Sequence, residues 1–197
     1  MHFIGGITLN LSFVLYFFFY LPQLIANFRH NKCTDLSLGF HALLLISATA
    51  DLYYAFGRID QWQYRVVSLM MFYCLLVQHV HLMVEIESFR YGRLKLWALS
   101  LIVVLMLCVL FWVMQTPSAH GRLFVLMGWV ERIGYWLYSV PQMIKNHQNK
   151  RADCLSPLFI SIAIVTALCD SVSAWCLSWG PSSLYGAPVA VMLHLIL

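Results

Sequence analysis

Residues 20–27, YLPQLIAN, return later in the chain as residues 140–146, VPQMIKN, and this repetition decides the fold. A shift of 119 residues aligns three identical residues of the two copies: Pro22 with Pro141, Gln23 with Gln142, and Asn27 with Asn146. The same shift aligns three residues of the segments that follow: Leu36 with Leu155, Ser37 with Ser156, and Phe40 with Phe159. Apolar composition alone cannot produce polar matches, so the chain contains an internal repeat.

The repeat continues into the apolar segments, where Asp51 aligns with Asp170. Each aspartate has a hydroxyl residue four positions earlier, Ser47 or Thr166. Acidic residues are rare in membrane spans and usually face a cavity or a partner. These two are therefore the first candidates for proton coupling or substrate binding, and the alternative is a structural ion pair or helix–helix hydrogen bond.

The composition is that of an integral membrane protein. Of 197 residues, 61% are hydrophobic, 15% aromatic and only 10% charged, whereas a soluble domain has about 25% charged residues. The net charge of +4 is modest, and we expect no nucleic-acid partner. The first apolar block, residues 3–28, lacks a basic start and a cleavage site, so we interpret it as a true span.

A bilayer core of about 30 Å requires roughly 20 apolar residues per helix. Seven segments meet this need, the last one short and interrupted by Pro188: about 3–28, 38–57, 66–86, 96–115, 123–144, 157–179 and 183–197. We therefore predict an all-α fold of seven transmembrane helices.

Two three-helix units joined directly would be inverted, and one linker helix restores the same orientation. The segment 96–115 contains no Asp, Glu, Lys or Arg, which suits a linker that faces lipid. The prediction is a 3+1+3 arrangement of parallel repeats. Its parts are a first repeat over 1–95, a linker over 96–122 and a second repeat over 123–197.

Basic residues in short loops favour the cytoplasmic side. One set of alternate loops holds eight of them: Arg29, Lys32, Arg90, Arg93, Lys95, Lys145, Lys150 and Arg151. The opposite set holds three, Arg58, Arg65 and Arg122. The N-terminus is therefore predicted outside and the C-terminus in the cytoplasm.

The duplicated Pro-Gln segments, each followed by a Lys and a Leu-Ser pair, resemble the PQ-loop family, which includes cystinosin-like lysosomal transporters and the SWEET sugar carriers. The resemblance implies a cavity between the two triplets and Pro-Gln turns facing the cytosol. In the cystinosin-like branch it also implies proton-driven export of amino acids. That branch often has Gly-Asp in the second helix, whereas Asp51 follows Thr49-Ala50 and Asp170 follows Leu168-Cys169.

The two prolines are candidate gate hinges. Each removes a backbone donor within its helix, and the alternative is a static kink. The amide pairs Gln23–Asn27 and Gln142–Asn146 are spaced four apart and share a helix face. They could hydrogen-bond across a closed gate or cap helix ends.

Glu131 and Arg132 lie in the middle of the fifth predicted helix, where the first copy has no charge. Adjacent residues point about 100° apart on a helix, so we expect them not to pair well. Arg132 should meet Asp51, Asp170 or a substrate carboxylate, either as a buried lock or as a binding group. Tyr135 and Tyr138 share the face of Glu131 and could form an aromatic wall or simply pack.

Gln78, His79 and His81 form a polar stripe in the third predicted helix. His79 and His81 are two apart and do not share a face, so no metal site is expected there. His41 could titrate as a sensor, although a packed histidine is the more common role.

No nucleophile–base triad, phosphate-binding glycine loop or metal cluster is evident, so neither an enzyme nor a cofactor is expected. We predict a secondary transporter for a small polar solute, foremost an amino acid, with protons as the possible coupling ion. A SWEET-type sugar facilitator and a membrane receptor or scaffold remain alternatives. The minimal loops favour a bacterial inner membrane over a lysosomal or vacuolar one, and the oligomeric state is left open.

Overall fold

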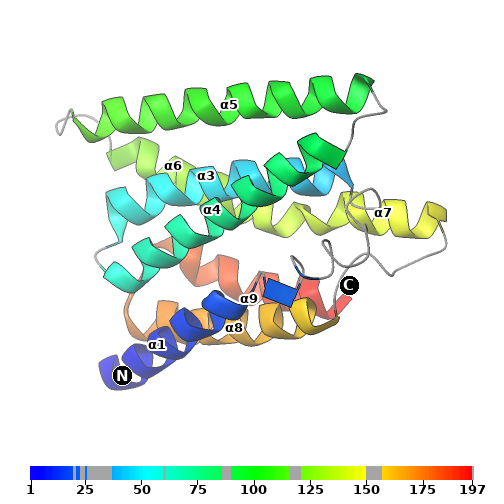
Figure 1. The fold of residues 1–197 in the computed structure, drawn as a ribbon. Coiled ribbons are helices and arrows are strands. Elements are labelled where there is room, and N and C mark those ends of the chain that lie inside the picture. The colour runs from blue at the N-terminus through cyan, green and yellow to red at the C-terminus, as the bar shows by residue number, and fades with distance from the viewer. Residues whose placement is uncertain are drawn as a thin grey trace.

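A computed structural model describes residues 1–19, 21, 22, 25, 37–59, 61–85, 90–115, 121–149 and 157–196. In these residues the regular elements are all helices (Figure 1). They are α1 (His2–Phe19), α3 (Leu38–Arg58), α4 (Trp62–Glu85), α5 (Arg90–Met114), α6 (Gly121–Leu137), α7 (Ser139–Asn149), α8 (Pro157–Cys176) and α9 (Pro181–Ile196). Five of them, α1, α3, α4, α5 and α8, are long and apolar enough to cross a bilayer.

The second copy of the Pro-Gln segment departs from the predicted single helix over 123–144. This helix divides at Tyr138, so that α6 ends at Leu137 and α7 begins at Ser139. Pro141 has no N–H for the carbonyl of Leu137 and crowds it, which explains a break one turn before the proline.

The predicted interruption at Pro188 is wrong, because α9 runs from Pro181 to Ile196 with Pro188 inside it. Proline is tolerated in membrane helices, where neighbouring groups compensate for the lost backbone bond.

Six helices form a closed ring. Helix α1 packs on α4 and α8, α3 packs on α4 and α6, and α9 packs on α6 and α8. Helix α5 lies at the edge of the molecule, against α3 and α4 (Figure 1). The first triplet contains α1, α3 and α4, and the second contains α6 with α7, α8 and α9. The first helix of each triplet packs on the second helix of the other: α1 on α8, and α6 on α3.

Matching contacts at these two interfaces follow the 119-residue shift. Phe19 packs on Phe159 with ring centroids 4.8 Å apart, and the equivalent residues Tyr138 and Phe40 pack at 5.1 Å. Each interface thus carries one aromatic contact three residues before its proline.

A second matched contact lies at the opposite end of each interface. A Cβ atom on Gly5 would lie 2.7 Å from Cβ of Cys176, and one on Gly57 would lie 2.2 Å from the ring of Phe124. Phe124 is the equivalent of Gly5, and Cys176 is the equivalent of Gly57. The small and larger partners have exchanged sides, while both helix pairs approach closely.

The exposed surface is apolar and the interior holds the polar groups. Helix α5 exposes Leu94, Trp97, Leu101, Phe111 and Trp112, whereas Asp51, Glu131 and Arg132 are buried. A soluble protein would bury the first set and expose the second. The chain is therefore a multi-pass membrane protein.

Candidate functional site

A cavity lies inside the helix ring, between the two triplets. All six ring positions contribute to its lining: Ser12, Tyr16 and Phe19; Asp51; Tyr64 and Ser68; Glu131, Arg132, Tyr135 and Tyr138; Thr166 and Asp170; and Ala190. The centres of water molecules could occupy about 90 Å³ of it, and a single water needs roughly 10–15 Å³ on this measure. The cavity therefore has room for a solute of several heavy atoms.

Asp51 is held by two hydroxyl groups of its own triplet. The Tyr64 hydroxyl donates to Oδ1 at 2.8 Å, and the Ser68 hydroxyl donates to Oδ2 at 2.5 Å. Tyr64 and Ser68 are one turn apart on α4, so both reach the same carboxylate. Only 6% of the Asp51 surface is exposed.

Asp170 is held in the same way, but from the other triplet. The hydroxyl of Ser12 donates to Oδ1, and that of Tyr16 donates to Oδ2 at 2.7 Å. Ser12 and Tyr16 are again one turn apart, here on α1, whereas Asp170 lies on α8. Asp170 is also more exposed than Asp51. This carboxylate therefore joins the two halves of the molecule, while Asp51 joins helices within one half.

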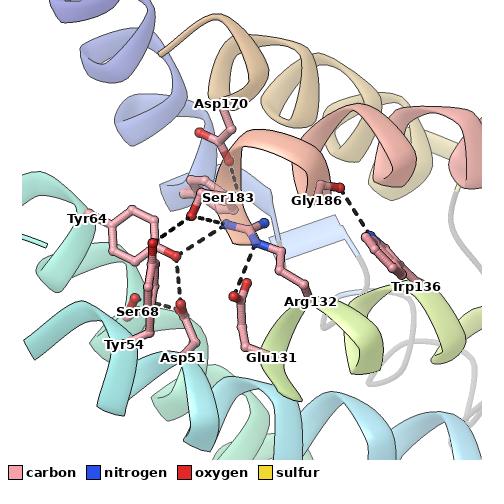
Figure 2. A network of polar contacts seen from close by, with 11 residues as sticks. Asp51, Tyr54, Tyr64, Ser68, Glu131, Arg132, Trp136, Asp170, Ser183 and Gly186 are labelled. Carbon is pink, nitrogen blue, oxygen red and sulfur yellow. Dashed lines mark hydrogen bonds and ion pairs between the residues drawn. The ribbon is translucent and has the colours of Figure 1, made fainter. Parts of the chain in front are cut away.

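Arg132 is the cation of the cavity, and it is 9% exposed. Its Nη2 donates to Ser183 at 3.2 Å and to the Tyr64 hydroxyl at 3.5 Å. Because Tyr64 also donates to Asp51, the guanidinium reaches that carboxylate through one hydroxyl (Figure 2). The Ser183 hydroxyl in turn donates to the hydroxyl of Tyr54 at 3.4 Å.

The expectation that Glu131 and Arg132 do not pair is wrong. Nε of Arg132 lies 3.2 Å from Oε2 of Glu131, and Glu131 is 1% exposed. The angle between neighbouring residues describes their Cβ directions, and a long arginine side chain can bend back to its neighbour. The hydrogen-bond geometry between these two atoms is nevertheless poor, so the ion pair leaves hydrogen-bonding capacity unused.

Helix α9 shapes the space around Arg132. A Cβ atom on Gly186 would lie 2.3 Å from Cδ of Arg132, so only glycine lets the arginine pass at this point. The indole of Trp136 donates to the carbonyl of Gly186 at 3.1 Å, which fixes α6 to α9 beside it (Figure 2).

The other predicted binding residues divide between the cavity and the packing around it. Tyr135 and Tyr138 line the cavity. Gln78 is buried, and its Nε2 has no hydrogen-bond partner in the described part of the chain. His79 bonds to His41 and Ser100. Neither Gln78 nor His79 is part of the cavity lining described above.

The Pro-Gln residues of the second copy contact the start of α3. Gln142 is fully buried, and its Oε1 accepts the backbone N–H of Ser37 at 2.8 Å. Its Nε2 donates to Asn146 at 2.8 Å. Gln142 thus connects α7 to the start of α3. In the first copy Pro22 is helical and half-buried, whereas Gln23 and Asn27 lie outside the described residues.

Comparison with known families decides the identity of the repeat. The PQ loop repeat family model matches residues 4–64 and again residues 123–183. The chain belongs to the PQ-loop family. The two matches of this PQ-loop protein are offset by 119 residues at both ends, which confirms the register of the internal repeat. A search of curated proteins returned no match.

Several residues of the site were not singled out from the sequence: Ser12, Tyr16, Tyr64 and Ser68 in the cavity lining, and Ser183 and Gly186 beside Arg132. Hydroxyl residues and glycines are common in membrane helices, so single occurrences carry little information. The signal was present in their spacing, since each aspartate meets a serine and a tyrosine four residues apart.

Proposed function

We propose that this PQ-loop protein is a secondary transporter that carries a small polar solute with an amino group, foremost an amino acid, by alternating access. Protons are the proposed coupling ion. We further propose that it spans the bilayer seven times, with triplets over 1–95 and 123–197 joined by a linker over 96–122. Family membership supports a transporter-like membrane protein, and the solute and coupling are our inference.

The observation that carries this proposal is the polar cavity between the triplets. Three acidic residues and one arginine line it: Asp51, Asp170, Glu131 and Arg132. Placing charged groups at the centre of a bilayer costs about 2.5–3.5 kcal/mol each on insertion scales. A purely structural helix bundle has no need of four such groups around an open space.

The charges favour an amine-bearing solute. Glu131 is engaged by Arg132, which leaves the carboxylates of Asp51 and Asp170 as acceptors for an ammonium group. Arg132 has further N–H donors for a solute carboxylate. A neutral sugar would require none of these charges, so their presence argues against a sugar facilitator.

The mechanism that we propose uses Asp170 as the link between the halves. When Asp170 accepts the hydroxyls of Ser12 and Tyr16, α8 is tied to α1. Protonation or solute binding at this carboxylate changes those bonds and so changes the contact between triplets. The aromatic contacts Phe19–Phe159 and Phe40–Tyr138 lie at the Pro-Gln end of the two interfaces, where they would close the cavity, with Pro22 and Pro141 as hinges.

The test is flux in liposomes. Purified protein is reconstituted, and uptake of labelled amino acids and sugars is measured with and without an inward proton gradient. We expect uptake of an amino acid that increases with the gradient. Uptake that ignores the gradient would remove proton coupling alone, and uptake of sugars only would replace the solute class. Binding without any flux would favour a receptor or scaffold, because one fold serves several functions.

Orientation and membrane complete the proposal. The distribution of Lys and Arg in the loops supports an outer N-terminus and a cytoplasmic C-terminus. We favour a bacterial inner membrane. Labelling of single cysteines introduced at residues 61 and 148, with an impermeant reagent on intact cells, distinguishes the two sides.

A further inference from the structure

A buried histidine pair lies in the first triplet, apart from the cavity. His41 on α3 and His79 on α4 are 0% and 4% exposed. Their rings are nearly parallel, with centroids 5.1 Å apart and an interplanar angle of 12°, and Nε2 of His41 lies 2.9 Å from Nδ1 of His79. Nε2 of His79 lies 2.8 Å from the hydroxyl of Ser100 on α5. The chain of contacts therefore connects three helices.

Matching donors to acceptors assigns the protons of this chain. The Ser100 hydroxyl donates to the carbonyl of Leu96 at 3.0 Å, so its oxygen accepts from Nε2–H of His79. Nδ1 of His79 is then the acceptor of a neutral ring, and Nε2–H of His41 is its donor. The reverse assignment would place a proton on Nδ1 of His41 and leave that buried N–H without a partner. Unpaired buried N–H groups are rarer in proteins than unpaired acceptors.

This assignment leaves one bare nitrogen. Nδ1 of His41 has a buried lone pair and no hydrogen-bond partner among the described residues. A proton can add there without breaking any bond of the chain. A second proton could add only at Nδ1 of His79, where it would oppose the N–H of His41. The pair therefore has room for one proton.

The surroundings make that proton costly. The elements packed against α3, the helix that carries His41, are α4, α5, α6 and α7. Toward this end of the molecule their described ionisable side chains are Cys74, His79 and His81 on α4, Arg93 and Lys95 on α5, Tyr138 at the α6–α7 junction, and Lys145 and His147 on α7. None of these is a carboxylate, so an imidazolium here would have no described anion to stabilise it.

We propose that His41 and His79 form a proton-binding dyad that holds α3, α4 and α5 together while neutral and loosens their packing when it takes up one proton at Nδ1 of His41. This site is separate from the aspartates of the cavity. It makes the first triplet and the linker helix sensitive to acid whatever solute the protein carries.

The experiment compares stability at different pH in detergent. Imidazole in water takes up a proton below about pH 6.5, so unfolding is favoured by about tenfold per pH unit below that value. From pH 7.5 to pH 5.5, we expect the melting temperature of the native protein to fall by about 3–6 °C more than that of His41→Gln. Glutamine keeps a donor toward His79 but cannot titrate. The control His147→Gln, at an exposed position of α7, should follow the native profile.

A second measurement covers the case in which His41→Gln does not fold. In ¹⁵N-histidine NMR of the native protein, Nδ1 of His41 should resonate as an unprotonated nitrogen at pH 7.5 and move toward the shift of a protonated one as the pH is lowered. Parallel melting profiles for the native protein and His41→Gln would overturn the proposal. So would a protonated Nδ1 of His41 at pH 7.5, or a resonance that does not move with pH.

Discussion

Arg132 passes α9 at the one residue without a side chain: a Cβ atom on Gly186 would lie 2.3 Å from Cδ of Arg132. The arginine bonds to Ser183 three residues before that glycine. The position of the cavity's cation therefore depends on the shape of a neighbouring helix as well as on its ion pair.

Gly186→Ala should displace Arg132. Glycine to alanine favours a helix by about 1 kcal/mol at an open position, but overpacking here should cost about 1–3 kcal/mol. We expect a lower melting temperature and weaker solute binding, measured by thermal unfolding in detergent and by binding assays. The matched control is Gly6→Ala, because no atom lies within 4 Å of a Cβ there. A stability of Gly186→Ala equal to that of Gly6→Ala would contradict the close passage.

Gln142→Ala should weaken the start of α3. The substitution removes the acceptor of the Ser37 N–H, and an unsatisfied backbone group costs about 1–3 kcal/mol when buried. Thermal unfolding measures the loss. Gln148→Ala, at an exposed position of the same helix, serves as control, and equal effects of the two substitutions would show that the Ser37 bond contributes little.

Asp170→Asn and Asp51→Asn should have different effects on transport. Asp170 bonds across the triplets, so its neutral variant should exchange solute across the membrane but lose accumulation driven by a proton gradient. Asp51 bonds within its triplet, so Asp51→Asn should lower stability and affinity while preserving the ratio of driven uptake to exchange. Counterflow and gradient-driven uptake are compared in the same liposomes. The reverse pattern would assign the coupling role to Asp51.

Gly57→Ala should destabilise the contact between α3 and α6. Its Cβ would lie 2.2 Å from the ring of Phe124, and the expected cost is about 1–3 kcal/mol. Adding Phe124→Ala should recover part of that loss by removing the obstructing ring. A double variant no more stable than the sum of the two single changes would show that the two residues do not interact.

The sequence was sufficient to predict the repeat, its register and the two aspartates. These rest on chemistry that membrane helices rarely tolerate, so Pro22, Asp51 and their counterparts were informative one by one. The family match at 4–64 and 123–183 confirms the 119-residue register, and both aspartates line the cavity.

The partners of those residues could not be predicted in the same way. The pairing of Glu131 with Arg132 depends on side-chain torsions, which a helical periodicity does not contain. The place of His79 depends on which helix lies beside α4, and α5 was expected only as a linker that faces lipid. The packing of Pro141 beside Gly39 depends on how α7 meets the start of α3.

The exchanged contacts Gly5–Cys176 and Phe124–Gly57 make the two halves mutually selective. Two copies of the first triplet would set Gly5 against Gly57 and leave a void, whereas two copies of the second would force Phe124 against Cys176. Correct assembly within one chain is thereby favoured over the pairing of like triplets from different chains, which is the misassembly that a duplicated protein risks most.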